Sequence, residues 1–314
     1  HVELPHINQN IGIDLGGSHI GVGLVDLNGK IVAKKDTDIH MKDAINIENF
    51  IIKTIVSDIK ELLEFNKNTL KDIDVIGIGT PGEPENGIIK RIVNLGIKDF
   101  PIVQKLQKEL NYNNIIIKND GKCAAIAEKM YGSMKEFEDC VFLCLGTGIG
   151  GASFLDSKLL KPKKHSGFEI GHMIIEKDGN LCKCGNRGCF ETYCSMKRLK
   201  EKINREINKE HMESRDLLIF LKENSENEKI KEIIKEYIEN LNIGLSNIIN
   251  LLEPQCITLG GGFVHFKDIL WNDLELEFKK AKYLFNKEDI PVIKLAELGN
   301  DAGIIGASID INKK

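Results

Sequence analysis

The sequence predicts an α/β protein built from two related domains. At 314 residues the chain exceeds the size at which one hydrophobic core usually stops growing. An apolar strand, a glycine-rich turn and a second strand occur near the start and again from residue 140 onward. Because this pattern restarts, we expect a small first domain at residues 1–120 and a larger second domain at 121–301, with a helix at about 302–314 that packs back on the first.

The predicted elements follow the chain in a regular order. Asn28-Gly29 between apolar runs is the turn pair typical of a β-hairpin, so the first strands should form an antiparallel meander. Apolar residues between Ile51 and Leu63 recur at helical spacing. The other predicted elements are strands at 11–15, 20–26, 75–80, 115–120, 140–145, 151–160, 256–259 and 292–298, and helical stretches at 123–130, 195–252 and 302–311.

Composition and charge exclude several classes of protein. With 42% hydrophobic and 29% charged residues, the chain has the composition of an ordinary globular protein. Its net charge is −4 and its lysines alternate with glutamates, so a nucleic-acid footprint is missing. No apolar run reaches the ~20 residues of a membrane span, and the first residues hold no signal-peptide core. We therefore expect a cytoplasmic protein without nucleic-acid or membrane partners.

Three glycine-rich turns each follow an apolar strand. Adjacent glycines let backbone N–H groups approach phosphate oxygens, and the aspartate before the first turn is suited to hold Mg²⁺ through water. The second turn leads into a strand rather than a helix, which argues against a dinucleotide-binding fingerprint. Each turn alone could be merely tight backbone, but together they could line a nucleoside triphosphate. The predicted ATP-binding residues are Asp14, Gly16, Gly17, Ser18, Gly146, Thr147, Gly148, Gly260, Gly261 and Gly262.

Asn119 and Asp120 lie at the end of a predicted strand. A carboxylate at a strand end, beside an amide that can fix a substrate hydroxyl, suits a base that accepts a proton during phosphoryl transfer. The alternative is a turn, which this residue pair also favours.

His172 and the segment Cys182-Lys-Cys184-Gly-Asn-Arg-Gly-Cys189 supply one imidazole and three thiolates within eighteen residues. This donor set is typical of a closed tetrahedral Zn²⁺ site, in which the metal is structural. Free or redox-active cysteines are the alternative. The other cysteines lie in apolar contexts and should be small buried hydrophobes; they are Cys123, Cys140, Cys144, Cys194 and Cys256.

These sites, in this order, resemble the ROK family (repressor, open reading frame, kinase). The most specific piece is GFEIGHMIIEKDGNLCKCGNRGCFETYCS at 167–195, which is similar to the family's Glu-x-Gly-His segment followed by its Cys-x-Cys-Gly-x-x-Gly-Cys zinc motif. The resemblance runs from about residue 11 to 308. It implies the two-domain actin/hexokinase-like (ribonuclease H-like) ATPase fold with an interdomain cleft, and a homodimer or homotetramer.

The resemblance also implies a kinase that moves the γ-phosphate of ATP onto a sugar hydroxyl, with Mg²⁺ as catalytic metal and Zn²⁺ as structural metal. Asp120 would be the catalytic base, and His172 would serve both the zinc and the sugar. The implied sugar-binding residues are Gly79, Asn94, Asn119, Glu169, His172 and Glu191.

Glucose, phosphorylated to glucose 6-phosphate, is the first expectation for the substrate. N-acetylmannosamine, fructose and N-acetylglucosamine stay open, because KKHSGF before Glu169 replaces the Gly- and Ala-rich run usual in bacterial glucokinases of the family. Lys164, His165 and Phe168 could reshape the rim of the sugar site. Ser18 stands where threonine is common and keeps the hydroxyl.

Two functions of other classes remain. A sugar-sensing transcriptional regulator of the same family would carry an N-terminal helix-turn-helix, whereas about ten residues precede the first predicted strand here. An ATPase of the actin and heat-shock type would not need the polar residues around Glu169. No role is expected for the remaining histidines, such as His19, His40, His211 and His265, because they show no partner spacing.

Overall fold

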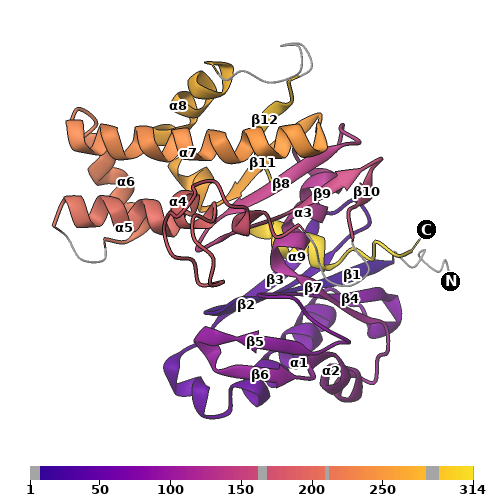
Figure 1. Cartoon of the computed structure of the whole chain (residues 1–314). Helices are drawn as coiled ribbons and strands as arrows, with labels where there is room; N and C mark the ends of the chain where they lie inside the picture. Colours follow the sequence, from indigo (N-terminus) through magenta and orange to yellow (C-terminus); the bar gives the residue numbers. More distant parts are fainter. Residues whose placement is uncertain (1–7, 162–167, 209–211, 281–289, 314) are drawn as a thin grey trace. The chain divides into compact units, whose positions relative to one another are not determined.

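The computed structural model describes residues 8–161, 168–208, 212–280 and 290–313 (Figure 1). The chain forms two compact units, His1–Lys135 with Glu297–Lys314, and Glu136–Ala296. The expected boundary at residue 120 instead coincides with the first residue of a helix, α3, which packs on α9 within the first unit. The first unit therefore continues to Lys135, and the segment that follows the second unit begins at Glu297.

The first unit contains a five-stranded sheet in the order β3-β2-β1-β4-β7. Its strands are β1 (Gln9–Leu15), β2 (His19–Val25), β3 (Ile31–Asp38), β4 (Ile73–Thr80) and β7 (Ile115–Asn119). Strands β1, β2 and β3 are antiparallel neighbours, which confirms the predicted meander, and Gly29 adopts φ 76° in its hairpin turn. Strands β4 and β7 run parallel to β1 and β4, respectively.

Helices cover both faces of this sheet. They are α1 (Ile47–Phe65), α2 (Ile102–Leu110), α3 (Asp120–Tyr131) and α9 (Ala302–Ala307). Because side chains alternate along a strand, Ile11, Ile13 and Leu15 share one face of β1, where they join α1 and α2 in one apolar core. Burying each such side chain contributes about 1.5–3 kcal/mol, so this core accounts for much of the unit's stability.

The other face of the sheet is in backbone contact with α9. A Cβ atom at Gly12 would lie 1.9 Å from the carbonyl oxygen of Ile304, and one at Gly77 would lie 1.6 Å from that of Ala307. Since neither carbonyl belongs to a movable side chain, only glycine lets α9 lie this close to β1 and β4.

A two-stranded hairpin of β5 (Ile89–Ile92) and β6 (Ile97–Phe100) completes the strands described in the first unit. No element was expected there from the sequence. The hairpin turn is a short 3₁₀ segment, Val93–Leu95, that ends at Gly96 with φ 65°. This turn presents Asn94.

The second unit repeats the strand arrangement of the first. Its sheet has the order β10-β9-β8-β11-β12. The first three neighbours are antiparallel, and β11 and β12 continue in parallel, as β4 and β7 do in the first unit. This repetition agrees with the expectation of two related halves. The strands are β8 (Cys140–Leu145), β9 (Ile149–Leu155), β10 (Lys158–Leu159), β11 (Cys256–Gly261) and β12 (Val292–Leu295).

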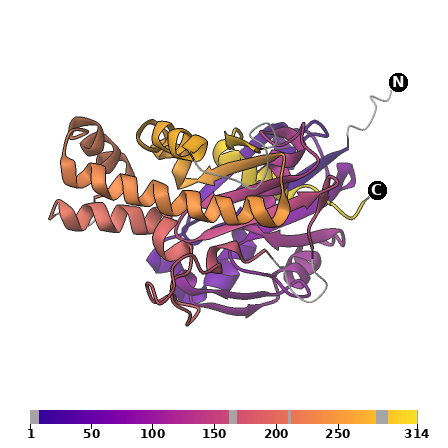
Figure 2. The ribbon, with the colours of Figure 1, turned by 45° about the horizontal axis from the view of Figure 1, so that its top comes forward.

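Helices dominate the rest of the second unit. They are α4 (Glu191–Cys194), α5 (Met196–Glu206), α6 (Ser214–Glu223), α7 (Glu228–Leu252) and α8 (Lys267–Lys280). The 25-residue α7 lies alongside α5 in both views (Figures 1 and 2). Gly244 of α7 faces the buried ring of Phe190, since a Cβ there would lie 2.3 Å from the ring's Cζ. This contact fixes the chain next to Cys189.

None of the described helices is both long and apolar enough to cross a membrane. The five cysteines expected in apolar surroundings are buried, except that Cys144 is half-buried.

Candidate functional site

In the first unit, three neighbouring strands end together. The register pairs Asp14 of β1 with Gly79 of β4, and Thr80 of β4 with Asn119 of β7. Asp120 follows directly as the first residue of α3. Because carboxyl ends of parallel strands meet at one edge of a sheet, these predicted site residues form one cluster.

The side chain of Asn119 stabilises the start of α3. Its Oδ1 accepts a hydrogen bond from the backbone N–H of Lys122 at 3.2 Å, and its Nδ2 donates to the carbonyl of Gly82 at 2.8 Å. Such N-caps stabilise a helix by about 1 kcal/mol. Asn119 therefore holds its neighbour Asp120 in place.

Asp120 is exposed as a residue, yet its carboxyl group is in an unfavourable place for a negative charge. Burial of the carboxyl, followed by the nearby charge of Asp14, raises the pKa of Asp120 to about 6, although its Oδ1 accepts the N–H of Gly121 at 2.7 Å. A carboxylate with a pKa close to the working pH is well suited to accept a proton.

The first glycine turn, Gly16 to Ser18, joins β1 and β2. It is tight, because the backbone N–H of Gly16 donates to the carbonyl of His19 at 2.9 Å. Asn94 lies against it, with Nδ2 3.2 Å from where a Cβ of Gly17 would be. A residue implied to bind sugar and a turn predicted to bind phosphate are thus neighbours.

The second glycine turn, Gly146 to Gly148, joins β8 and β9 as a strand-to-strand turn, as predicted. Glu191, the first residue of α4, lies directly against it. Its Oε2 accepts the backbone N–H of Ile149 at 3.0 Å, and a Cβ at Gly148 would lie 2.3 Å from the same oxygen. The glycine at 148 therefore makes room for the Glu191 carboxylate.

The third glycine turn lies beside the second. The register of β8 and β11 pairs Leu145 with Gly261. Gly261 has φ 71°, and a Cβ there would lie 2.7 Å from the carbonyl oxygen of Leu145. Gly262 begins the 3₁₀ segment that leads into α8. The two turns therefore lie side by side in the second unit.

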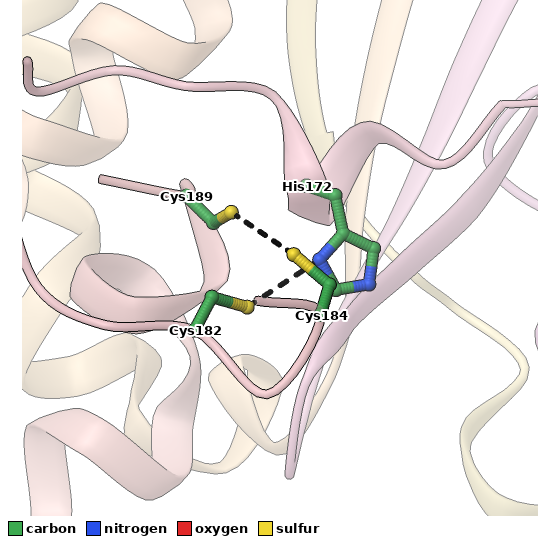
Figure 3. Close-up of side chains that lie close together, drawn as sticks. All are labelled: His172, Cys182, Cys184 and Cys189. Carbon is green, nitrogen blue, oxygen red and sulfur yellow. Dashed lines mark hydrogen bonds between the residues drawn. The ribbon is translucent and has the colours of Figure 1, made fainter. Parts of the chain in front are cut away.

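His172, Cys182, Cys184 and Cys189 converge, as Figure 3 shows. Cys182 Sγ lies 3.5 Å from His172 Nδ1, Cys184 Sγ lies 3.6 Å from Cys189 Sγ, and all four donor atoms lie within 4.8 Å of one another. Tetrahedral Zn²⁺ with Zn–S bonds of about 2.3 Å holds its sulfurs about 3.8 Å apart. The donor set and its spacing therefore fit Zn²⁺.

Glycines shape the backbone around these donors. Gly185 and Gly188 have φ of 93° and 80°, and a Cβ at Gly188 would lie 1.7 Å from the carbonyl oxygen of Glu176. An antiparallel bridge between Ile174 and Cys189 and a second between Leu181 and Arg187 close the loop. Both glycines of the Cys-Gly-x-x-Gly-Cys pattern are thus structurally required.

Glu169 precedes the 3₁₀ turn that carries His172, and its carbonyl accepts the His172 N–H at 3.0 Å. Its neighbour Phe168 is half-buried with φ 53°. Lys164 and His165, the other members of the predicted rim, lie outside the described residues.

The sequence model of the ROK family matches residues 10–314. The chain belongs to the ROK family. A glucokinase of Halalkalibacterium halodurans is 30% identical over 94% of this chain and 92% of its own length. A xylose repressor of Caldicellulosiruptor bescii is 25% identical over 96% of this chain and 77% of its own length.

Solved ROK structures show the same fold. A ROK hexokinase from Thermus thermophilus superposes with a TM-score of 0.81 at 24% identity, covering 96% of both chains. A ROK glucokinase from Streptomyces griseus, in complex with glucose and AMPPNP, gives 0.72 at 23% identity, covering 96% of this chain and 98% of its own. The predicted family and its actin/hexokinase-like ATPase fold are confirmed.

One residue of this ROK chain has a partner that the sequence analysis did not identify. His19 Nε2 lies 3.5 Å from Asp14 Oδ2, and its ring lies against Gly16. The hydrogen bond to Asp14 raises the pKa of His19, and the charges of Asp36 and Asp38 add to this effect. No role was expected for His19, because the sequence shows no partner spacing for it; the contact with Asp14 arises because the two residues flank one tight turn between antiparallel strands.

Proposed function

We propose that this chain is an ATP-dependent sugar kinase that transfers the γ-phosphate to a hydroxyl of a hexose. The observation that carries the proposal is Asp120, which begins α3 at the edge where β1 and β4 also end and has its pKa raised to about 6. The glucokinase of H. halodurans, 30% identical along nearly the whole chain, supports the same activity.

The first unit supplies the base in this proposal. Asp120 accepts the proton of the sugar hydroxyl as that oxygen attacks the γ-phosphorus, and the capping bonds of Asn119 keep the carboxylate in position. Asp14 and the N–H groups of the turn from Gly16 to Ser18 face the phosphates. Asp14 would hold Mg²⁺, which would neutralise phosphate charge. Gly79 and Asn94 adjoin the same cluster as sugar contacts.

The second unit supplies two further groups of residues. The turn from Gly146 to Gly148 holds phosphates, and Gly260 to Gly262 offer bare backbone to the nucleoside. Glu169, His172 and Glu191 contact sugar hydroxyls. The zinc ligands orient the ring of His172 and tie Glu191, two residues after Cys189, to the metal segment.

Glucose is the first candidate substrate, supported by the relatives named glucokinase. N-acetylmannosamine is the second, because a putative N-acetylmannosamine kinase from Listeria monocytogenes shares the fold with a TM-score of 0.74 at 23% identity, covering 96% of this chain and 97% of its own. Fructose and N-acetylglucosamine complete the panel. Since ATP is the donor, we propose a cytoplasmic protein, and a homodimer or homotetramer that light scattering would identify.

The test is ADP release from Mg-ATP with glucose, mannose, fructose, N-acetylglucosamine and N-acetylmannosamine. One sugar should stimulate turnover, and Asp120→Asn should reduce kcat by about 10²–10⁴-fold, the usual contribution of a general base. Asp156→Asn is the matched control, because Asp156 is an exposed turn residue paired with Lys158. ADP release that no sugar stimulates, or that Asp120→Asn does not reduce, would contradict the kinase proposal.

Asp120→Asn should also leave the fold intact. A raised pKa means that the ionised carboxylate is less stable in the folded than in the unfolded chain. Its removal should therefore not lower the unfolding temperature at pH 7, and a large decrease would show that lost activity reflects lost structure.

A non-catalytic sugar sensor is the second candidate, because a xylose repressor matches 96% of this chain. Sugar binding by calorimetry without ADP release, together with a specific gel shift of operator DNA, would favour it.

A further inference from the structure

Lys183 occupies the position between two predicted zinc ligands, Cys182 and Cys184. Its ammonium group points out of the metal segment, with Nζ 3.1 Å from Glu191 Oε1. The same Nζ lies 3.7 Å from where a Cβ of Gly148 would be. A residue of the zinc segment thus reaches the second glycine turn.

Glu191 connects Lys183 to the backbone of that turn. One carboxylate oxygen pairs with Lys183, and the other accepts the N–H of Ile149 at 3.0 Å. The Glu191 side chain is 12% exposed, whereas that of Lys183 is 73% exposed. The buried partner depends on this ion pair more than the exposed one does, because its charge has been largely removed from water.

A cation such as the Lys183 ammonium would reduce the negative charge next to the second glycine turn. The Glu191 carboxylate lies directly against Gly148, in a turn proposed to bind phosphates. Two anions a few ångströms apart repel each other, and the repulsion grows as water is excluded. The ammonium of Lys183 offsets the charge of Glu191 on the side facing the turn. Because metal ligands flank Lys183 on both sides, a bound zinc would hold its backbone in place.

We propose that Lys183 is a positioning residue that holds Glu191 against the second glycine turn and so links the zinc segment to sugar binding. The inference rests on the proposed function, in which Glu191 contacts the sugar. It assigns Lys183 neither a catalytic step nor a metal bond.

The test measures the Kd of sugar by calorimetry, using glucose, mannose, fructose, N-acetylglucosamine and N-acetylmannosamine as probes. Lys183→Met keeps the length and removes the charge, and Lys183→Arg keeps the charge. Lys177→Met is the matched control, since Lys177 is an exposed lysine of the same segment. Lys183→Met should raise the Kd about 5-fold, which corresponds to about 1 kcal/mol, the upper end for an ion pair with one exposed partner, while Lys183→Arg and Lys177→Met stay within about twofold.

Salt and zinc content separate positioning from a purely structural role. Between about 0.1 M and about 1 M salt the Debye length falls from about 10 Å to about 3 Å, so wild-type affinity should decrease toward that of Lys183→Met, whose own affinity should change little. Every variant should hold the same amount of zinc as the wild type. Unchanged affinity in Lys183→Met, or zinc loss that parallels the lost affinity, would overturn the inference.

A double-mutant cycle with Glu191→Gln tests whether Lys183 affects sugar binding through Glu191. If Lys183 acts through Glu191, then Lys183→Met should add little in the Glu191→Gln background, whereas additive losses would contradict the inference. The two proposals fail in different ways. Wild-type chain that binds sugar without releasing ADP contradicts the kinase, whereas a Lys183→Met chain that binds sugar as tightly as the wild type contradicts the role of Lys183.

Discussion

Glu128 of α3 holds together two segments of the first unit, and changing it should strongly destabilise that unit. Its side chain is completely buried. Oε1 accepts the backbone N–H groups of Glu297 and Leu298 at 2.8 and 2.9 Å, and Oε2 accepts the N–H and hydroxyl of Ser133 at 2.8 and 2.9 Å. The carboxylate thus ties the segment after α3 to the segment before α9.

Glu128→Gln keeps the shape but replaces one acceptor oxygen with an NH₂ group. If the amide oxygen accepts the N–H groups of Glu297 and Leu298, the NH₂ group faces Ser133. The hydroxyl of Ser133 can rotate and accept a hydrogen bond from this NH₂ group, but the backbone N–H of Ser133 is left without an acceptor. A buried donor left without an acceptor costs about 1–3 kcal/mol, and each remaining bond loses about 1 kcal/mol with the charge. The sum is about 3–5 kcal/mol, which corresponds to about 10 °C in the unfolding temperature of a unit this size.

Differential scanning calorimetry of the full chain measures this effect. Glu109→Gln is the control, because Glu109 is exposed on α2 of the same unit and should change stability by less than about 0.5 kcal/mol. If Glu128→Gln unfolds within about 2 °C of the wild type, the reasoning from buried hydrogen bonds is refuted.

Three further predictions concern other parts of the molecule. Because the base must be ionised, kcat/KM for the sugar should fall about tenfold per pH unit below the Asp120 pKa of about 6; a profile flat down to about pH 5 would contradict this assignment. Atomic absorption should find one zinc per chain, which Cys182→Ser should lose with a lower unfolding temperature; equal zinc in both proteins would refute the metal site. Gly77→Ala should destabilise by about 3 kcal/mol in urea unfolding, because its Cβ would lie 1.6 Å from the carbonyl of Ala307, whereas Gly150→Ala, with nothing within 4 Å, should be nearly neutral.

Sequence patterns predicted most elements because their signals are local. The strand at 140–145 matches β8, and the apolar spacing from Ile51 to Leu63 lies inside α1. Strands β5 and β6 have four residues each, too few to show an alternating pattern. Asp120, expected as the last residue of a strand, begins α3 instead, since the capping side chain of Asn119 starts the helix.

In the candidate site too, features that are local in sequence were predictable, whereas contacts that depend on the folded structure were not. The convergence of His172 with Cys182, Cys184 and Cys189 was predictable because these four donors lie within eighteen residues of sequence. The bond between His19 and Asp14 depends on how two side chains turn around a tight loop, and the pair of Lys183 and Glu191 depends on how the metal segment folds back. Such contacts occur at no characteristic sequence spacing, so a sequence pattern cannot predict them.

The backbone contact between α9 and the first sheet affects how the chain folds as it is synthesised. The second unit is one continuous stretch, Glu136–Ala296, whereas the first unit is completed by residues that follow it. During synthesis, the second unit can reach its final structure before α9, the helix that covers Gly12 and Gly77, has been made. Of the two units, the one whose synthesis begins earlier is therefore finished later, and a chain cut before Ala302 would leave Gly12 and Gly77 without the helix that covers them.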